Sequence, residues 1–234
     1  MKKSVIFIST AVLVCFVWAV GLCLQALLGA QSVSAFDTAM RIVVDAGHGG
    51  IDGGVTGRQT GVKESEINLA IAFKLSAALE EMGFEVVMTR KTEAGLYDTT
   101  AKGFKKRDMQ RRKEIILNAS PTLVISVHQN YYPSQAQRGA QVFYADGNEQ
   151  SALLATQIQT HMNGLFAAEG VKSRAAAKGD YFMLNCAACP SVIVECGFLS
   201  NAKDEALLAS KAWQEKTARK IAAGVVAYLA VGEG

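Results

Sequence analysis

Two of the three histidines in the chain stand directly after short apolar runs, and a glutamate closes a third such run. The residues are His48, His128 and Glu195. Short β-branched runs predict buried strands, and ligands collect at the carboxyl ends of the strands of an open α/β sheet. Neutral imidazole and carboxylate groups are the ligands that catalytic zinc uses. The pattern therefore predicts a metalloenzyme.

A hydrolytic zinc site uses three protein ligands and keeps one position open. His48 and His128 supply two of them, and Glu64 is the candidate for the third because it begins the helix expected after the His48 loop. Glu66 is the nearest alternative, but it would project from a different side of that helix. Glu195 is the candidate for an unligated acid, which takes a proton from water and returns it to a leaving nitrogen.

Each of these residues has a structural alternative when it is taken alone. A single histidine at a strand end is more often structural than a ligand, and a glutamate at a helix start usually interacts with the helix dipole. Their joint placement at separate strand-to-loop junctions favours the metal site. His161 falls on a polar stretch of an expected helix and is predicted to be a surface residue.

The elements that must position these residues follow from hydrophobic periodicity and from glycines at turns. Strands are expected at residues 41–45, 85–89, 123–127, 141–144 and 192–195. Helices are expected at residues 64–82, at a basic segment running to 118, and at 151–166, 203–209 and 213–229. This alternation predicts an α/β fold with a mostly parallel, twisted open sheet and helices on both faces.

The N-terminus predicts a membrane segment. Residues 4–36 carry no charged side chain, and the apolar run at 5–30 exceeds the roughly 20 residues that cross a bilayer. Lys2 and Lys3 precede the run, so the N-terminus is expected in the cytoplasm and the rest of the chain outside it. Residues 1–36 are therefore a signal anchor, with a cleaved signal peptide as the alternative, and residues 37–234 form one catalytic domain.

Charge gives no support for nucleic-acid binding, because 22 basic residues face 21 acidic ones once Lys2 and Lys3 are removed from the 24. One basic cluster remains, and its expected role is a solvated helical face, with a surface for an anionic polymer as the alternative. The cluster contains Lys102, Lys105, Lys106, Arg107, Arg111, Arg112 and Lys113.

Cys186, Cys189 and Cys196 lie in the catalytic domain. Cys186 and Cys189 form a CxxC motif. A zinc ribbon needs a second CxxC pair, and a thioredoxin-type redox site needs the motif at the start of a helix. The sequence meets neither condition. We expect ordinary thiols, with a local disulfide as the alternative.

The motifs around these residues resemble the zinc-dependent N-acetylmuramoyl-L-alanine amidases of bacterial cell walls, the amidase type 3 family. The resemblance covers residues 41–229. In its small size and its one N-terminal membrane segment, the chain is most similar to the sporulation and germination amidases of that family. The matching strings are Val44-Asp45-Ala46-Gly47-His48-Gly49-Gly50, Glu64, Ser126-Val127-His128-Gln129-Asn130 and Val194-Glu195-Cys196-Gly197-Phe198-Leu199-Ser200-Asn201.

The resemblance implies that His48, Glu64 and His128 bind one Zn²⁺ and that Glu195 is the catalytic carboxylate. It implies hydrolysis of the amide between N-acetylmuramic acid and the L-alanine of the stem peptide in peptidoglycan. The substrate would be spore cortex, as a step toward muramic-δ-lactam, with the enzyme outside the cytoplasm between the forespore and mother-cell membranes. Tyr131 stands where the family commonly has a small residue, which predicts a narrower substrate groove.

The chain lacks the acidic helical insertion that blocks the site of some relatives, so control by a partner protein or by timing of expression is expected. Two other functions remain open at this point. One is a zinc peptidoglycan deacetylase or peptidase with similar ligands. The other is an inactive wall-binding module, against which the presence of all four site residues argues.

Overall fold

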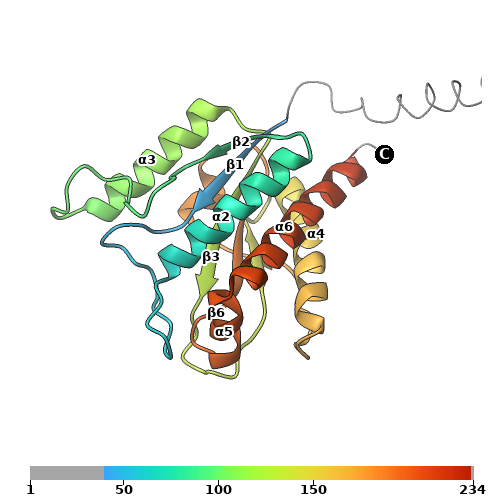
Figure 1. The fold of residues 1–234 in the computed structure, drawn as a ribbon. Coiled ribbons are helices and arrows are strands. Elements are labelled where there is room, and N and C mark those ends of the chain that lie inside the picture. Colours follow the sequence, from blue (N-terminus) through green and yellow to red (C-terminus); the bar gives the residue numbers. More distant parts are fainter. Residues whose placement is uncertain (1–39, 233–234) are drawn as a thin grey trace, which may run out of the picture. The chain divides into compact units, whose positions relative to one another are not determined.

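The computed structural model describes residues 40–232, which form a six-stranded sheet between two layers of helices (Figure 1). The strands are β1 Arg41–Ala46, β2 Glu85–Met88, β3 Leu123–Asn130, β4 Gln141–Tyr144, β5 Ala177–Lys178 and β6 Ser191–Phe198. The helices are α2 Glu64–Glu81, α3 Phe104–Ala119, α4 Glu149–Ala167, α5 Ala202–Ala209 and α6 Lys211–Gly232, with a short 3-10 helix η2 at Phe182–Asn185.

The strand order is β2-β1-β3-β6-β4-β5, and the sheet is mixed. Strands β2, β1, β3 and β6 are parallel neighbours, β4 runs antiparallel to β6, and β5 is parallel to β4. The carboxyl ends of β1, β3 and β6 therefore lie side by side at one edge of the sheet. This is the edge where the candidate site residues were expected.

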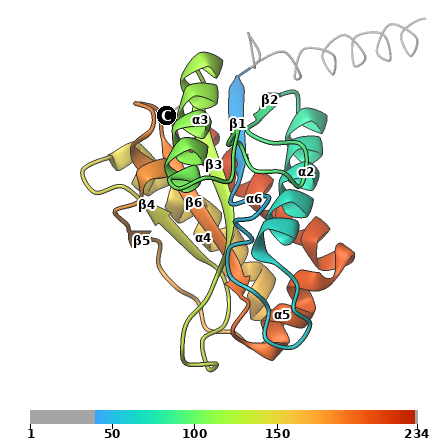
Figure 2. The same cartoon turned by 90° about the vertical axis from the view of Figure 1, so that its left-hand side faces the viewer.

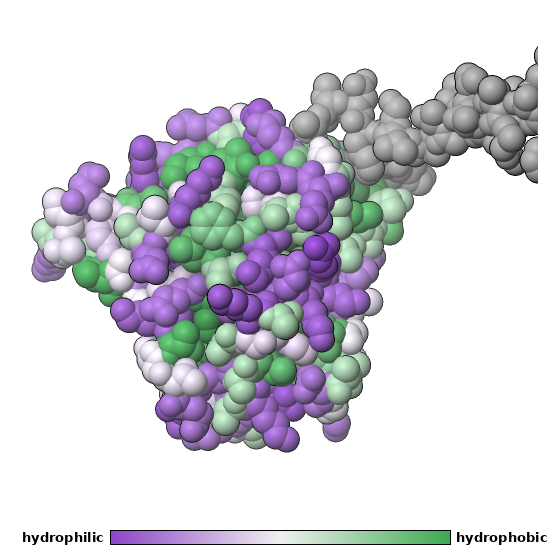
Figure 3. Space-filling model, viewed as in Figure 1, coloured by the Kyte–Doolittle hydropathy of each residue, from purple (hydrophilic) through white to green (hydrophobic). Residues whose placement is uncertain are grey.

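Alternating side chains along each strand supply two separate cores. Ile42 and Val44 of β1 face the layer of α2, α4 and α6, whereas Val43 belongs to a smaller core with Ile116 of α3. Figures 1 and 2 show α3 on one side of the sheet and α2, α4 and α6 on the other. The prediction of helices on both faces is confirmed. On the face shown in Figure 3, hydrophilic and hydrophobic residues are interspersed over the described surface.

The predicted elements agree with the structure except at their ends, and the short strand β5 and the 3-10 helix η2 were not predicted. Strands β3 and β6 continue to Asn130 and Phe198, so His128 and Glu195 lie inside strands and not at their ends. The two residues of β5 were not predicted, because a segment of that length shows no periodicity.

The predicted membrane segment at residues 1–36 lies outside the described residues, and the division at residue 36 stays a prediction. Among residues 40–232, no helix is both long and apolar enough to cross a bilayer.

Helix α3 buries a charged stripe, so the predicted solvated face includes exposed residues such as Lys105 and Arg111 but not Arg112. Its buried residues are Asp108, Arg112, Ile116 and Ala119, which recur at the spacing of one helical face. Arg112 is only 1% exposed, while Lys105 and Arg111 of the same helix are exposed. The basic cluster thus contains one buried residue, Arg112, whose role differs from that of its exposed neighbours.

Arg112 makes a buried ion pair with Asp45, the second-last residue of β1. Its Nη1 lies 2.6 Å from Oδ1 of Asp45, and its Nε lies 2.6 Å from Oδ2 of Asp108. The hydroxyl groups of Thr89, directly after β2, and Ser126, in β3, donate hydrogen bonds to the Asp45 carboxylate. Burial works to raise the pKa of Asp45, but the Arg112 charge and these hydroxyls outweigh it and lower the pKa to about 2.

We expect Asp45→Asn to lower the free energy of unfolding by about 3–5 kcal/mol, because it leaves the buried Arg112 charge without its main partner. Urea unfolding at neutral pH measures this loss. The control is Arg111→Gln, which breaks an exposed pair with Glu114 on the same helix and should cost about 1 kcal/mol or less. Equal losses in the two variants would contradict the assignment.

The low pKa of Asp45 also predicts the direction of acid sensitivity. A carboxyl group whose pKa is lower in the folded state stabilises the fold above its unfolded pKa of about 4. This stabilisation should be lost as the pH falls from there toward about 2. Urea midpoints measured across this range should fall less steeply for Asp45→Asn than for the unchanged protein; parallel curves would show that Asp45 does not contribute.

Candidate metal centre

The candidate site lies at the carboxyl edge of the sheet, where three elements meet. His48 follows β1 by two residues, His128 lies within β3, and Glu64 is the first residue of α2. Because β1 and β3 are adjacent and parallel, their ends bring the two histidines together, and α2 begins beside them. The structure therefore assembles side chains that are up to 80 positions apart in the sequence.

The three side chains converge on one point. Their nitrogen and oxygen atoms all lie within 4.8 Å of one another. Oε1 of Glu64 lies 2.9 Å from Nδ1 of His128 and 3.3 Å from Nε2 of His48. Two imidazoles and one carboxylate are the donor set of hydrolytic zinc sites, so the residues present fit this metal.

Glu64 is almost fully buried, at 2% exposure, whereas its alternative Glu66 is exposed and lies outside the cluster. Burial works to raise the pKa of Glu64, but the hydrogen bonds with His128 and His48 outweigh it and hold the pKa well below its usual range. Backbone N–H groups of Val55 and Gln129 also donate to its carboxylate. Glu64 is thus a charged, oriented ligand candidate.

Two backbone features let the histidines approach so closely. His48 adopts a left-handed conformation with φ of 59°, which is uncommon for a residue with a side chain. Gly47 lies directly against the ring of His128, where an added Cβ would sit 2.2 Å from Cε1. The glycine before His48 is therefore required by the packing of the second histidine.

Glu195 lies beside the cluster on the neighbouring strand. It is the register partner of His128 in the parallel β3–β6 pair, so both side chains leave the sheet on the same face. Its Oε2 is buried and has no hydrogen-bond partner among residues 40–232. Burial raises the pKa of Glu195 to about 7. The carboxyl group is close enough to the cluster for the charges of His128, Glu64 and His48 to affect its pKa.

Asp52 orients His48 and was not predicted from the sequence. Its Oδ2 lies 3.1 Å from Nδ1 of His48, and its Oδ1 lies 3.1 Å from Nζ of Lys105. A carboxylate on one imidazole nitrogen fixes the ring and leaves the other nitrogen available as a ligand. The available signal was an acid four residues after His48 within the glycine-rich loop.

Two buried arginines hold the backbone of the His48 loop. Arg112 donates to the carbonyl oxygens of Ala46 and His48, and Arg90 donates to those of Ala46 and Gly47. Arg90 is 3% exposed and also reaches the carbonyl of Ser65 in the first turn of α2. These bonds link the supports of His48 and Glu64.

The remaining predicted features lie away from the cluster or beside it. His161 lies on α4, where its Nδ1 bonds the carbonyl of Gln157, and is not part of the cluster. Cys186, Cys189 and Cys196 are free thiols, as expected. Tyr131 follows β3, is 37% exposed, and accepts a hydrogen bond from Nε of Arg58.

Comparisons with known proteins agree on one family. The sequence pattern described as N-acetylmuramoyl-L-alanine amidase matches residues 42–227. The germination-specific N-acetylmuramoyl-L-alanine amidase of Bacillus subtilis is 34% identical over 190 residues, which cover 80% of this chain and 78% of that protein. The amidase LytC of the same organism is 30% identical, over 80% of this chain and 35% of that protein. The structure of the CwlD amidase from Clostridioides difficile, in complex with the GerS lipoprotein, is similar with a TM-score of 0.78 and 35% identity, covering 82% and 99% of the two chains.

We expect Asp52→Asn to weaken zinc binding by about 10- to 100-fold, because His48 loses the carboxylate that fixes its ring. Competition with a chromogenic chelator measures the affinity. Asp98→Asn, at an exposed acid outside the cluster, serves as the matched control. Zinc affinity that is unchanged in Asp52→Asn would show that the contact with His48 has no role in holding the metal.

Proposed function

The chain belongs to the N-acetylmuramoyl-L-alanine amidase family and is a peptidoglycan hydrolase, and we propose that His48, Glu64 and His128 hold its zinc ion while Glu195 transfers the proton. The convergence of two imidazoles and a carboxylate beside an unpartnered buried carboxyl group carries this proposal. Zinc in such a donor set polarises carbonyl groups and makes water more acidic.

The bond cleaved is the amide between the lactyl group of N-acetylmuramic acid and L-alanine. In the proposed mechanism Glu195 accepts a proton from the attacking water, whose oxygen forms a bond to the lactyl carbonyl carbon. The carbon–nitrogen bond then breaks, and Glu195 returns the proton to the nitrogen of alanine. The products are a free lactyl carboxylate and a stem peptide with an N-terminal amine.

The chain contributes to this step by holding Glu195 in a fixed position. Glu195 is held in register with His128 by the β3–β6 ladder, so its carboxyl group keeps its position next to the metal ligands. Positioning of this kind can supply much of the barrier reduction in hydrolysis. Glu195 Oε2 has no hydrogen-bond partner among the described residues.

The proposed substrate is spore cortex peptidoglycan, with cleavage as a step toward muramic-δ-lactam. Similarity to the germination-specific amidase of Bacillus subtilis and to CwlD of Clostridioides difficile supports this. Cleavage of vegetative wall is the alternative. A partner protein is also proposed, since the similar CwlD was captured in complex with a lipoprotein.

The proposed location is outside the cytoplasm, with residues 1–36 as a membrane anchor or signal and residues 37–234 as the catalytic domain. The substrate is extracytoplasmic, and the apolar N-terminal run supports the anchor. Peptidoglycan deacetylase and peptidase activities are not favoured, because the family and its relatives are amidases.

We expect Glu195→Gln to lower kcat by about 10²- to 10⁴-fold, because the amide cannot carry the proton. Mass spectrometry of digested cortex and vegetative wall should detect stem peptides with an N-terminal alanine, released by the unchanged protein only. Zinc content should stay the same in the variant, since Glu195 lies outside the donor set.

Glu66→Gln is the matched control, because this glutamate is exposed on α2 two residues from Glu64. It should cleave as the unchanged protein does. Release of acetate, or of stems shortened at an internal peptide bond, would contradict the amidase assignment. Full activity of Glu195→Gln would contradict the role given to this residue.

A further inference from the structure

We propose that Tyr181 contacts the stem peptide at the residue that follows L-alanine, and that this contact makes Tyr181 a specificity-determining residue. The proposal rests on the proposed function, because it takes the amide of L-alanine as the bond that is placed at Glu195. Tyr181 itself is neither part of the cluster of His48, Glu64 and His128 nor the group that transfers the proton.

Glu195 points to the face of the sheet that carries α3 and η2. Ile193, two residues earlier on β6, belongs to the core that contains Met183 and Leu184 of η2. Side chains two residues apart on a strand leave the sheet on the same face. Glu195 is partly exposed, so a substrate reaches it from this face.

Tyr181 lies on the same face, over the strand that pairs with β6. Its ring packs edge-on against Phe143 of β4, with 5.4 Å between the ring centroids and 65° between the ring planes. Phe143 is the register partner of Ile193 and packs against the same core as Ile193 does. Glu195 follows Ile193 by two strand residues, or about 7 Å, so Tyr181 borders the surface in front of Glu195.

The hydroxyl group of Tyr181 lies within the electrostatic range of Glu195. Burial raises the pKa of Tyr181 above its usual value, and the negative charge of Glu195 raises it further. The hydroxyl takes part in none of the hydrogen bonds found among residues 40–232, where Tyr181 uses its backbone carbonyl. The phenol is therefore protonated at neutral pH, and its hydroxyl is available to a ligand.

The ring of Tyr181 is held in place and yet exposed. An added Cβ at Gly179 would sit 2.5 Å from Cε2 of Tyr181 and 3.3 Å from Cδ1 of Phe143, so the ring occupies space that the glycine leaves open. Despite these contacts, 44% of Tyr181 is exposed. A side chain that is already fixed loses little conformational freedom when a ligand packs on it, which favours binding.

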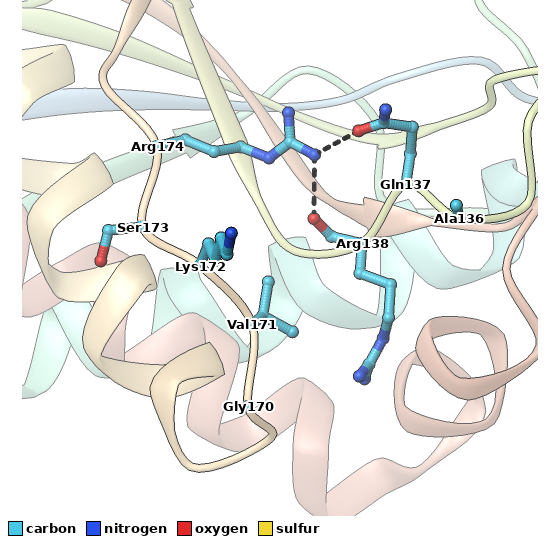
Figure 4. A pocket seen from close by; sticks show the side chains of 8 residues that line it. All are labelled: Ala136, Gln137, Arg138, Gly170, Val171, Lys172, Ser173 and Arg174. Carbon is cyan, nitrogen blue, oxygen red and sulfur yellow. Dashed lines mark hydrogen bonds between the residues drawn. The ribbon is translucent and has the colours of Figure 1, made fainter.

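The other face of the sheet does not give access to Glu195. Val171 packs against the core of α2, α4 and α6, and it lines a hollow between residues 136–138 and 170–174. Figure 4 shows this hollow, in which Arg174 is hydrogen-bonded to two groups of the facing wall. The hollow therefore lies on the side of the sheet away from Glu195, and it supplies a control for the test.

The proposed mechanism places the stem peptide on the side of Tyr181. Glu195 returns the proton to the alanine nitrogen, so this nitrogen lies beside β6, while the lactyl group lies toward the cluster at β1 and β3. The strand order β1-β3-β6-β4 then directs the stem, which continues from alanine, away from the cluster and toward β4. Each extended residue spans about 3.3–3.6 Å, so the second stem residue lies about 7 Å from the nitrogen, which matches the distance along β6 from Glu195 to Ile193.

The test combines a shortened substrate with a shortened side chain. Muramyl-L-alanine lacks the second stem residue, whereas muramyl-L-alanyl-D-isoglutamine carries it. The unchanged full chain should cleave the longer substrate with a KM about tenfold lower, and Tyr181→Leu should abolish this preference by raising that KM alone. The kcat should stay similar for both substrates, because the contact is made equally before and during the reaction.

Tyr181→Phe keeps the ring and loses only the hydroxyl. It should retain part of the preference, with a KM for the longer substrate about threefold above that of the unchanged protein. Phe73→Leu is the matched control, since Phe73 on α2 is 43% exposed and Tyr181 is 44% exposed. Lys172→Gln, at an exposed lysine of the hollow in Figure 4, is the second control. Both controls should keep the full preference.

A binding measurement without turnover separates this proposal from the proposed function. In the Glu195→Gln background, Tyr181→Leu should weaken binding of the longer substrate by about tenfold and change that of muramyl-L-alanine by no more than about twofold. Titration calorimetry measures both affinities, and circular dichroism establishes that the variants are folded.

An equal rise in KM for the two substrates in Tyr181→Leu would overturn the proposal, because it would place the contact at the sugar or at alanine. A loss confined to kcat would also overturn it, since Tyr181 would then act through Glu195. So would equal KM values for the two substrates in the unchanged protein. Failure to cleave either substrate at the alanine amide, with the difference in binding retained, would instead contradict the proposed function.

Discussion

The buried ion pair between Arg112 and Asp45 is the interaction on which the site depends most. It joins α3 to β1, and the same guanidinium reaches the carbonyl oxygens of Ala46 and His48. Arg90 completes the arrangement by holding Gly47 and the first turn of α2. A positive φ at His48 is unfavourable by itself, and persists only where surrounding contacts determine the backbone. The two arginines provide those contacts, so the position of His48, a proposed metal ligand, is set by charged side chains outside the His48, Glu64 and His128 cluster.

Glu195, the proposed proton-transfer group, is supported in a different way from the proposed metal ligands. His48 and Glu64 come from loops and helix ends that need polar anchors, whereas Glu195 and His128 lie inside adjacent strands whose register fixes them. His128 and Glu195 pair directly before the register of the ladder shifts between His128 and Asn130, and this pairing holds the two residues side by side. The loop that carries His48 contains Gly47, which lets the rings of His48 and His128 come close together.

Strands, helices and the convergence of site residues could be predicted from the sequence, because β-branched runs and helical stripes are strong local signals. His48, Glu64, His128 and Glu195 stood out since each lies next to such a signal. Arg112 could not be separated from its basic neighbours, because its burial depends on Asp45, 67 positions earlier in the sequence. Asp52 was missed although it lies only four residues after His48, because an acid in a glycine-rich loop carries no local signal that shows which side chain it contacts. The length of β3 and β6 also depends on pairing, since their last residues have no strand pattern of their own.

The position of β6 in the sheet determines when, during synthesis, the site can be completed. β6 is the last strand in the chain, yet it lies between β3 and β4 in the middle of the sheet. A growing polypeptide therefore has no complete reaction centre until Phe198 has emerged and its strand has inserted between two earlier ones. The topology therefore delays completion of the site during synthesis, and truncated chains ending before residue 191 would lack both Glu195, the proposed proton carrier, and one of the two central strands.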